Sequence, residues 1–407
     1  MLPDMEQVPG RDMPQPVARE ELPAYLRWLI RPVKDGMWLR LPVIDTNPNR
    51  GVTGGLMPVF VLHEKDGDRI KQIHAPSATY NRHFGPDVTY RYYAYPQEDA
   101  SLVLRGDLSK YEHEVLAQYE DASFWDTDFD FSLLGHYNVD GGQRYFGVGP
   151  DTPKNKETNY KEDYIQYRLS AGMPLRPKSP WRMHVSDMLT FDKISDGPLQ
   201  GLPSFGETFP HAVFPGRRQI HTMRLILDYD TRDNPLTTSR GAYVQEFAEY
   251  SAGNFGSGRD FGRYGIDARY IHPWNESKTQ ATAAQLKFEQ LLGNAPFWQQ
   301  SRLGGKYSLR AYGDGRYTDR GLIAANIEQR MTMYKAKMAG VWTEFELAPF
   351  VGMGTVFHDA DRMAARYARP VVGSAIRAIA RPQVVGSVDF GVGQEGLAIF
   401  MDINYSF

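Results

Sequence analysis

The final segment of the chain, Leu397–Phe407, carries an apolar side chain at every second position. The apolar positions are Ile399, Met401, Ile403, Tyr405 and Phe407, and Asp402, Asn404 and Ser406 alternate with them. A period of two places the two sets on opposite faces of a β-strand. A strand at the end of a chain needs partners on both edges, and a closed barrel supplies them because its last strand pairs with its first. The segment therefore predicts a transmembrane antiparallel β-barrel with a lipid-facing outside and a hydrated lumen. The alternative is a soluble sheet whose last strand ends in an aromatic residue.

Composition agrees with an all-β barrel and excludes a helical membrane protein. The 407-residue chain has a mean hydropathy of −0.49 and lacks the long apolar run that a spanning helix needs. A barrel tolerates such polarity because half of each strand faces a wet lumen. The 24 Tyr, 21 Phe and 7 Trp also suit the two aromatic girdles of a membrane barrel.

Several other chemistries lack the residues that they need. The chain has no cysteine, which excludes disulfides, thiolate metal sites and cysteine nucleophiles. The histidines are not at metal-ligand spacings, and no Gly-x-Ser-x-Gly elbow occurs. Asp126, Asp128 and Asp130 either hold a cation at a loop or line the wet face of a strand. A net charge of −3 offers no basic field for nucleic acid. We expect no enzyme, cofactor, metal site or nucleic-acid partner.

Residues 1–36 are predicted to be an extension, and residues 37–407 the barrel. Within the extension, the stretch from Glu20 to about Val33 has apolar residues at helical spacing, with Pro23 near the first turn. This predicts a short helix that packs on or under the barrel or lies on the membrane surface. The opening residues lack a basic start followed by an apolar core, so we expect the exporting peptide to be missing from this numbering.

After Gly36 the chain consists of many short alternating runs separated by turn-rich segments. The clearest runs are His221–Asp230, Tyr164–Gly172 and Ile323–Arg330. Counting such runs gives about 14 to 18 strands, and an even number of about 16 is expected for a bacterial barrel. Residues 194–218 and a segment around 359–370 show little alternation and are predicted to be long loops.

The most specific stretch is Leu303–Arg330. It contains the pair Gly304 and Gly305, a tip with Arg310 and Tyr312, and a following strand with Glu328. The stretch resembles the long loop that folds back into the barrel in the BamA/TamA superfamily of bacterial outer-membrane assembly and translocation proteins. A guanidinium inside a lumen needs a carboxylate in fork geometry, and Glu328 on the inward face of its strand is the candidate. Such an ion pair would fix the loop in place across the lumen. The alternative is a surface loop whose arginine is solvated.

Other pieces resemble the same superfamily. Leu227–Tyr243 resembles its strand, acidic turn and Asn-Pro hairpin, which implies that five residues shape the reversal: Asp230, Arg232, Asp233, Pro235 and Gly241. Arg144–Pro153 and Ala348–Ala360 match two further segments. The resemblance also implies that the terminal residues Phe407, Tyr405 and Ile403 belong to a signal that the barrel assembly machinery reads.

The chain departs from the superfamily at two positions of the loop lock. Ala311 replaces the usual tip glycine, so the tip cannot rely on a positive φ. Gly352 replaces an inward aspartate that helps to anchor the loop arginine in the family. We therefore expect the anchoring to fall more heavily on Glu328 and the lock to be weaker.

The resemblance implies a bacterial outer-membrane barrel that inserts or translocates proteins or lipids. Its expected partners are outer-membrane lipid, periplasmic proteins or lipoproteins, and client proteins. The family's periplasmic POTRA domains do not fit in residues 1–36, so we expect them to be absent or supplied by another protein. The competing hypothesis is a structural anchor or passive channel that partners a larger envelope complex.

Overall fold

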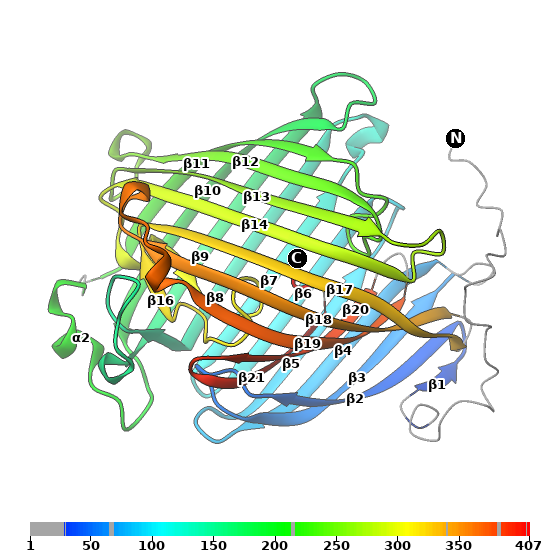
Figure 1. The fold of residues 1–407 in the computed structure, drawn as a ribbon, viewed down its shortest axis with the longest axis horizontal. Coiled ribbons are helices and arrows are strands. Elements are labelled where there is room, and N and C mark those ends of the chain that lie inside the picture. Colours follow the sequence, from blue (N-terminus) through cyan, green and yellow to red (C-terminus); the bar gives the residue numbers. More distant parts are fainter. Residues whose placement is uncertain are drawn as a thin grey trace.

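In a computed structural model, one antiparallel sheet curves around on itself to form a barrel (Figure 1). The structure describes residues 28, 30–64, 69–212, 216–338, 341–380, 384–403 and 405–407. The strands of this part form a nearly closed barrel of 18 strands. The all-β barrel that the alternation predicts is confirmed, with slightly more strands than the expected 16.

The wall is built of strands that each pair with the next one along the chain. They are β2 (Gly36–Asp45), β3 (Thr53–His63), β4 (Ile70–Asn81), β5 (Gly85–Ala94), β6 (Ala100–Ser109), β7 (Glu112–Asp121), β8 (Asp130–Tyr145), β9 (Thr158–Pro174), β10 (Trp181–Asp196), β11 (Arg218–Asp230), β12 (Gly241–Ser251), β13 (Phe261–Pro273), β14 (Gln280–Gly293), β17 (Gly321–Met338), β18 (Val341–Phe357), β19 (Arg369–Ala380), β20 (Val384–Gly393) and β21 (Gly396–Ile403). A short strand, β1 (Ile30–Val33), pairs with β2. β15 (Ser301–Leu303) and β16 (Tyr317–Asp319) form a separate two-stranded sheet within the loop between β14 and β17.

From Ile30 onward, the helical structure of the described residues consists of single turns in the connections. These turns are η2 (Phe124–Asp126), η3 (Lys154–Lys156), α2 (Phe205–Thr208), η4 (Pro210–Ala212), η5 (Gly253–Phe255), η6 (Phe297–Gln299), η7 (Ala360–Arg362) and η8 (Ala365–Tyr367). Across the described ranges, no helix has the length and apolar character required to cross a membrane.

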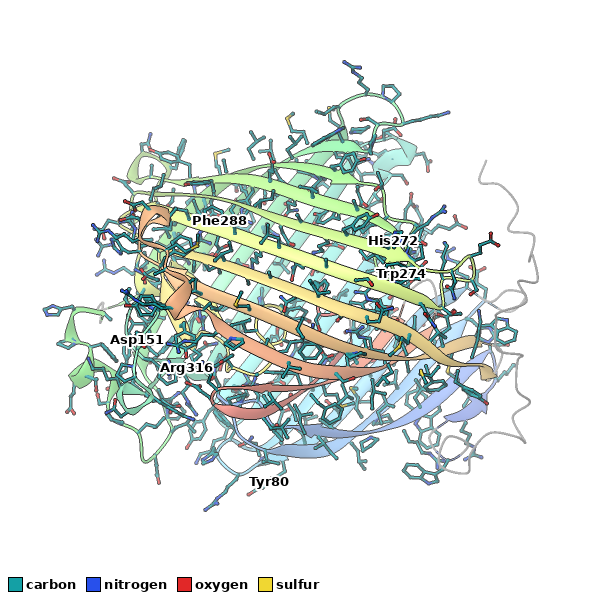
Figure 2. All side chains as sticks on the ribbon, viewed as in Figure 1. Tyr80, Asp151, His272, Trp274, Phe288 and Arg316 are labelled. Carbon is teal, nitrogen blue, oxygen red and sulfur yellow. The ribbon has the colours of Figure 1, made fainter. Side chains whose placement is uncertain are left out.

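Side chains along the strands alternate between the outside and the lumen (Figure 2). On β17, Ile327 is 51% exposed on the outer face, whereas its neighbours Asn326 and Glu328 are 2% and 1% exposed on the inner face. Exposed apolar residues such as Leu225 and Val351 continue this outer surface on other strands. An apolar outside around a polar inside is the arrangement of a barrel in lipid.

The two ends of the barrel differ in the length of their connections. One end carries the longest loops, residues 146–157, 197–217, 294–320 and 358–368. The other end carries mostly short turns and the last described residues of the chain. Outer-membrane barrels have short periplasmic turns and longer extracellular loops, so this asymmetry indicates which end faces the periplasm.

The structure corrects the prediction for the end of the N-terminal extension. Most of the helix expected from Glu20 to about Val33 falls outside the described residues. Ile30–Val33, however, is a strand that pairs with Gly36–Leu39 through a two-residue turn. Main-chain pairing with the free edge of β2 outweighs the helical spacing of the apolar residues here.

The structure also corrects the path of the final segment. β21 ends at Ile403, and Tyr405–Phe407 are not part of any strand. Their side chains are buried, at 9%, 3% and 9% exposure, instead of facing lipid. Phe407 packs with Ala281 and Ala283 on the inner face of β14. The alternation of two therefore continues in the sequence beyond the point at which the chain leaves the wall.

The boundary between β2 and β21, here called the seam, has few hydrogen bonds among the described residues, and they lie at the end of β2, where the Asp45 carboxylate accepts from the Met401 backbone. Thr46 follows β2 and donates its backbone N–H to the Ile399 carbonyl oxygen at 3.1 Å, while its hydroxyl accepts from the Ile399 N–H at 2.9 Å. In the part of the chain that the structure covers, no ladder joins β2 to β21. Because β3 occupies the opposite edge of β2, β1 lies on the seam edge.

Candidate functional site

The loop between β14 and β17 enters the barrel and fills part of the lumen. Its apolar side chains pack against inward residues of β17, β18 and β19 in one buried cluster. Gly304 and Gly305 make the entry possible because their φ angles are +130° and +82°. A Cβ on Gly305 would also lie 1.8 Å from Asp314 Oδ1. Only glycine adopts this backbone without steric cost.

The loop tip rests directly on the barrel wall. Tyr312 is fully buried, and its hydroxyl accepts from the Gln394 N–H at 3.2 Å. Asn326 of β17 donates its amide to the Ser308 carbonyl oxygen at 3.0 Å. A Cβ on Gly391 of β20 would lie 1.7 Å from the Arg310 carbonyl oxygen. Gly391 therefore provides the space in which the tip lies.

Replacing Gly391 by alanine is expected to push the loop tip off the wall. The added methyl group collides with backbone, so relief requires a shift of the tip and costs about 1–3 kcal/mol of unfolding free energy. Gly386→Ala on the same strand is the matched control, because its nearest neighbour is the Ala378 carbonyl oxygen at 3.9 Å. Urea unfolding in detergent compares the two variants. Equal midpoints would show that the tip does not depend on this contact.

Arg310 lies in a buried cluster of charges, here called the arginine–carboxylate cluster. Its members are Arg310, Arg330, Arg377, Glu328, Glu346 and Asp389. Glu328 lies 3.0 Å from Arg310, 2.7 Å from Arg330 and 2.9 Å from Arg377. The six side chains carry three positive and three negative charges, so the cluster is neutral as a whole. Neutrality and dense hydrogen bonding allow these charges to be buried.

The loop motif predicts that Arg310 pairs with Glu328, but it does not predict most of this cluster. Arg377 on β19 also contacts Glu346 on β18, at 2.8 Å, and Asp389 on β20 lies 3.9 Å from Arg310. Strand alternation indicates that these side chains face the lumen, but it does not give their depth or partners. Asp389 thus supplies a second carboxylate beside the loop arginine, in a lumen where Gly352 replaces the family's aspartate.

The end of the chain joins the same cluster. Arg330 donates to the Phe407 main-chain oxygen at 3.0 Å, and its guanidinium lies 4.0 Å from the Tyr405 ring centre. The Ser406 hydroxyl donates to Asp389 at 2.9 Å. Tyr405 and Phe407, two of the three residues expected to form the terminal signal, therefore lie in the lumen beside arginines. Ile403 is the last residue of β21.

The hairpin between β11 and β12 has its own polar network. Arg232 pairs with Asp230 at 2.7 Å and donates to the Pro235 carbonyl oxygen at 3.3 Å. Asp233 accepts from the backbone N–H of Ser239 at 2.9 Å and from Lys278 at 3.0 Å. Gly241 begins β12 with a φ of +113°. The five residues singled out in the sequence thus all lie at this reversal.

The same hairpin reaches the arginine–carboxylate cluster, because Arg330 donates to the Thr238 carbonyl oxygen at 3.3 Å. Three segments far apart in the sequence therefore meet at Arg330 or its partner Glu328: the hairpin, the lumen loop and the final residues. Nothing in the hairpin sequence signals this long-range contact.

Asp233 lies in the hairpin turn outside the strands, and its ionisation should make the free energy of unfolding depend on pH in the acidic range. Burial raises its pKa, but hydrogen bonds from Ser239, Lys278 and Arg240 outweigh burial and lower the pKa to about 2. Because the folded pKa lies below the ordinary value of 3.8, the stabilisation is present above that value and is lost as the pH falls towards 2. We expect Asp233→Asn to lower the urea midpoint at pH 7 and to match the parent chain near pH 2. A constant difference across this range would contradict the assignment.

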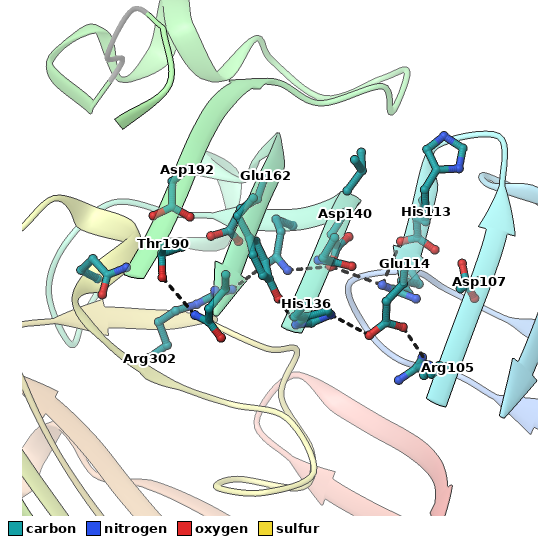
Figure 3. A pocket seen from close by; sticks show the side chains of 18 residues that line it. Arg105, Asp107, His113, Glu114, His136, Asp140, Glu162, Thr190, Asp192 and Arg302 are labelled. Atoms are coloured by element: carbon teal, nitrogen blue, oxygen red, sulfur yellow. Dashed lines mark hydrogen bonds and ion pairs between the residues drawn. The ribbon is translucent and has the colours of Figure 1, made fainter. Parts of the chain in front are cut away.

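The rest of the lumen holds water-accessible cavities. One of about 470 Å³, here called the lumenal chamber, lies between the inner faces of β6–β10 and Arg302 of the lumen loop (Figure 3). Glu114 in its wall pairs with Arg105 at 2.8 Å and with His136 at 2.9 Å. Among the described residues that line it, six are carboxylates and three are arginines, so its wall is acidic.

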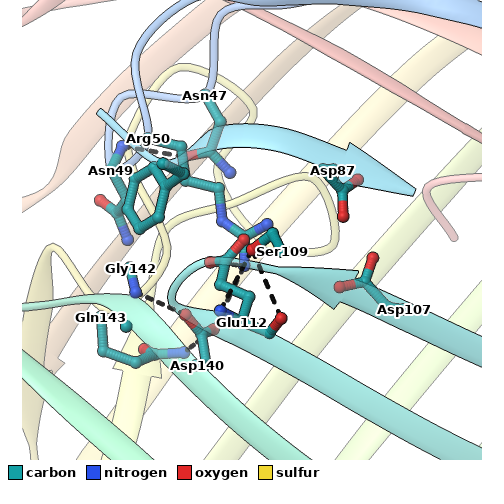
Figure 4. Close-up of polar contacts among 12 residues, drawn as sticks. Asn47, Asn49, Arg50, Asp87, Asp107, Ser109, Glu112, Asp140, Gly142 and Gln143 are labelled. Carbon is teal, nitrogen blue, oxygen red and sulfur yellow. Dashed lines mark hydrogen bonds and ion pairs between the residues drawn. The ribbon is translucent and has the colours of Figure 1, made fainter. Parts of the chain in front are cut away.

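Arg50 crosses from the loop after β2 to the opposite wall. It lies 2.8 Å from Glu112 on β7 and 3.3 Å from Asp140 on β8 (Figure 4). Gln143 and the Gly142 N–H hold Asp140 in place, at 2.7 and 2.6 Å. A second cavity of about 260 Å³ adjoins the chamber at Arg50 and Asp140. This bridge divides the extracellular half of the lumen.

A third cavity of about 760 Å³ lies towards the short-turn end and is here called the periplasmic vestibule. Asn234, Pro235 and Leu236 of the hairpin line its mouth. It approaches the lumenal chamber along two strands. Gln166 and Thr190 line the chamber, and Arg168 and Met188, two residues away on the same strands, line the vestibule.

The apolar outer surface, the hydrated lumen and the inward loop define a β-barrel protein of the bacterial outer membrane. A model of the Omp85 superfamily domain matches residues 100–378, more than half of the chain, and the chain belongs to the Omp85 superfamily. This confirms the resemblance found in the lumen loop and the hairpin.

The solved structures that share the fold include the following two. The crystal structure of BamA from Haemophilus ducreyi lacking POTRA domains 1–3 is 13% identical, with a TM-score of 0.55 over 90% of this chain and 75% of that one. CdiB from Escherichia coli is 11% identical, with a TM-score of 0.55 over 90% of this chain and 67% of that one. A search of curated protein sequences returned no match.

Proposed function

We propose that this barrel inserts or translocates other proteins at the outer membrane, with the seam as the working element. The observation that carries the proposal is that, among the described residues, no ladder joins β2 to β21 and only a few hydrogen bonds around Thr46 and Ile399 connect them. On the seam edge, Arg40–Asp45 of β2 have no ladder partner among the described residues. An unpaired edge offers C=O groups and, except at Pro42, N–H groups to an incoming strand, which is the basis of β-augmentation.

The lumen loop supports this function by holding the far side of the seam. Tyr307 and Lys306 of the loop contact Asp402 on β21, and the loop is itself fixed at the arginine–carboxylate cluster. The last strand thus keeps its place in the wall without a full ladder to β2. The proposed mechanism is physical: strand pairing guides insertion, and no group here acts as a chemical catalyst. Omp85 barrels are assembly and transport proteins, and we propose that this chain likewise has no enzymatic activity.

A passive channel is the second candidate, and the acidic cavities favour it. The lumenal chamber and the periplasmic vestibule abut along β9 and β10, and a narrow opening between them would let small cations pass. The proposed partners also differ: client proteins and periplasmic or lipoprotein helpers for insertion, and only lipid and solute for a channel.

Reconstitution in liposomes separates the two functions. An inserting barrel accelerates the folding of an added, urea-unfolded outer-membrane barrel, whereas a channel gives cation-selective conductance in a planar bilayer. We expect faster client folding with little conductance. Folding at the rate of empty liposomes would overturn the insertion proposal, and conductance without faster folding would establish the channel.

A further inference from the structure

The register of the seam shows which residues of β2 would face the end of the chain. Thr46 lies opposite Ile399, and the two strands run antiparallel, so the numbers of opposed residues add up to 445. Continuing this register past Ile403 would place Tyr405 opposite Arg40, Ser406 opposite Leu39, and Phe407 opposite Trp38. The final residues thus have a defined place on the β2 edge.

That place is already taken by β1. β1 pairs with Gly36–Leu39 on the seam edge, with Arg31 opposite Trp38 and Ile30 opposite Leu39. Trp38 and Leu39 cannot pair with both segments, because a strand edge has one set of N–H and C=O groups. The final residues lie in the lumen instead, with Ser406 on Asp389 and the Phe407 oxygen on Arg330.

We propose that β1 and the segment Tyr405–Phe407 are alternative partners for one stretch of the β2 edge, so that β1 keeps the seam from closing. With β1 in place, the final residues stay in the lumen and the seam has no ladder. When β1 leaves, the final residues move into the wall and pair with the stretch of β2 from Trp38 to Arg40.

The state with the final residues in the lumen and the state with them in the wall are held by different interactions. Moving the final residues into the wall breaks the hydrogen bonds to Asp389 and Arg330 and removes Phe407 from Ala283, but it restores main-chain pairing along β2. β1 pairs with β2 over only four residues, so its hold on β2 is limited. An incoming strand that displaces β1 would release the same edge. The proposal uses the seam described above but does not depend on the insertion activity.

Disulfide trapping tests the exchange. Because the chain has no native cysteine, only the two introduced cysteines of each pair can form a disulfide within the chain. One pair, Ala283→Cys with Phe407→Cys, reports the lumen state. A second pair, Leu39→Cys with Ser406→Cys, reports the seam state. Thr46→Cys with Ile399→Cys is the control, because these residues are in contact in the structure. Each pair is made in the full chain and in a variant whose residues 30–33 are Gly-Ser-Gly-Ser, a sequence with poor strand propensity.

In the parent chain we expect the 283–407 disulfide to form and the 39–406 disulfide to stay at background. In the Gly-Ser variant we expect the 39–406 yield to rise to that of the control pair and the 283–407 yield to fall. A 39–406 yield that stays at background while the control pair still forms would overturn the proposal. So would equal 39–406 yields with and without β1. Formation of the 46–399 disulfide shows that the variant barrel is folded. The cross-linking yields are measured without any client protein, so they do not depend on the insertion activity.

Discussion

Replacing Glu328 by alanine is expected to lower the free energy of unfolding by about 3–5 kcal/mol, the usual cost of removing one partner from a buried ion pair. Glu328 is 1% exposed and contacts three arginines at 3.0 Å or less. Without it, three guanidinium groups share only Glu346 and Asp389, and one buried positive charge stays uncompensated. Urea unfolding in detergent, followed by electrophoretic mobility without boiling, measures the loss.

Two comparisons make this result specific. Glu276→Ala removes an exposed carboxylate from a turn and should change stability by no more than about 0.5 kcal/mol. Arg310→Ala should cost less than Glu328→Ala, because Glu328 keeps Arg330 and Arg377. The double variant should fall short of the sum of the single effects, since the two groups touch. Full additivity would show that the lumen loop is not held by this pair.

Locking the seam is expected to remove the proposed activity altogether. Ile44 and Met401 lie two residues along the register from the Thr46–Ile399 contact, so a disulfide between Ile44→Cys and Met401→Cys would join β2 to β21 along the unpaired edge. An incoming strand could then no longer pair with β2. We expect client folding to fall to the rate of empty liposomes when the disulfide is formed and to recover when it is reduced.

The matched control places a disulfide across a ladder that is already complete. Val185→Cys with Leu225→Cys joins opposite outer-face residues of β10 and β11, far along the wall from the seam. This cross-link should leave client folding unchanged. Equal inhibition by both cross-links would mean that the activity needs general flexibility of the barrel and not an open seam.

The features that could be predicted from the sequence are those set by residues close together in the chain. Alternation along the strands predicts the barrel and the facing of residues such as Ile327 and Glu328, because the side-chain period of a strand is fixed by its backbone. The glycine pair and the arginine tip predict the inward loop. These features depend on neighbours within a few residues or on a motif with a single sterically allowed backbone.

The remaining features depend on contacts between distant segments. Alternation continues through Tyr405 and Phe407 although the wall ends at Ile403, because the arginines that hold the final residues lie on other strands. Arg377, Glu346 and Asp389 are visible as inward charges, but only the assembled barrel brings them to one depth. β1 is a local exception: it was expected to be helical because the apolar residues from Glu20 to about Val33 have helical spacing, and four residues are too few to show the alternation of a strand.

An incoming strand is expected to pair with β2 at the seam. Cross-linking of an assembly intermediate tests it directly: the chain carries Pro42→Cys on the β2 edge, and the stalled client carries a cysteine in its last strand. We predict a disulfide between the two proteins at this position and none when the cysteine is placed instead at Leu133 on the outer face of β8. Equal cross-linking at both positions, or none at Pro42 while the client still folds, would contradict it.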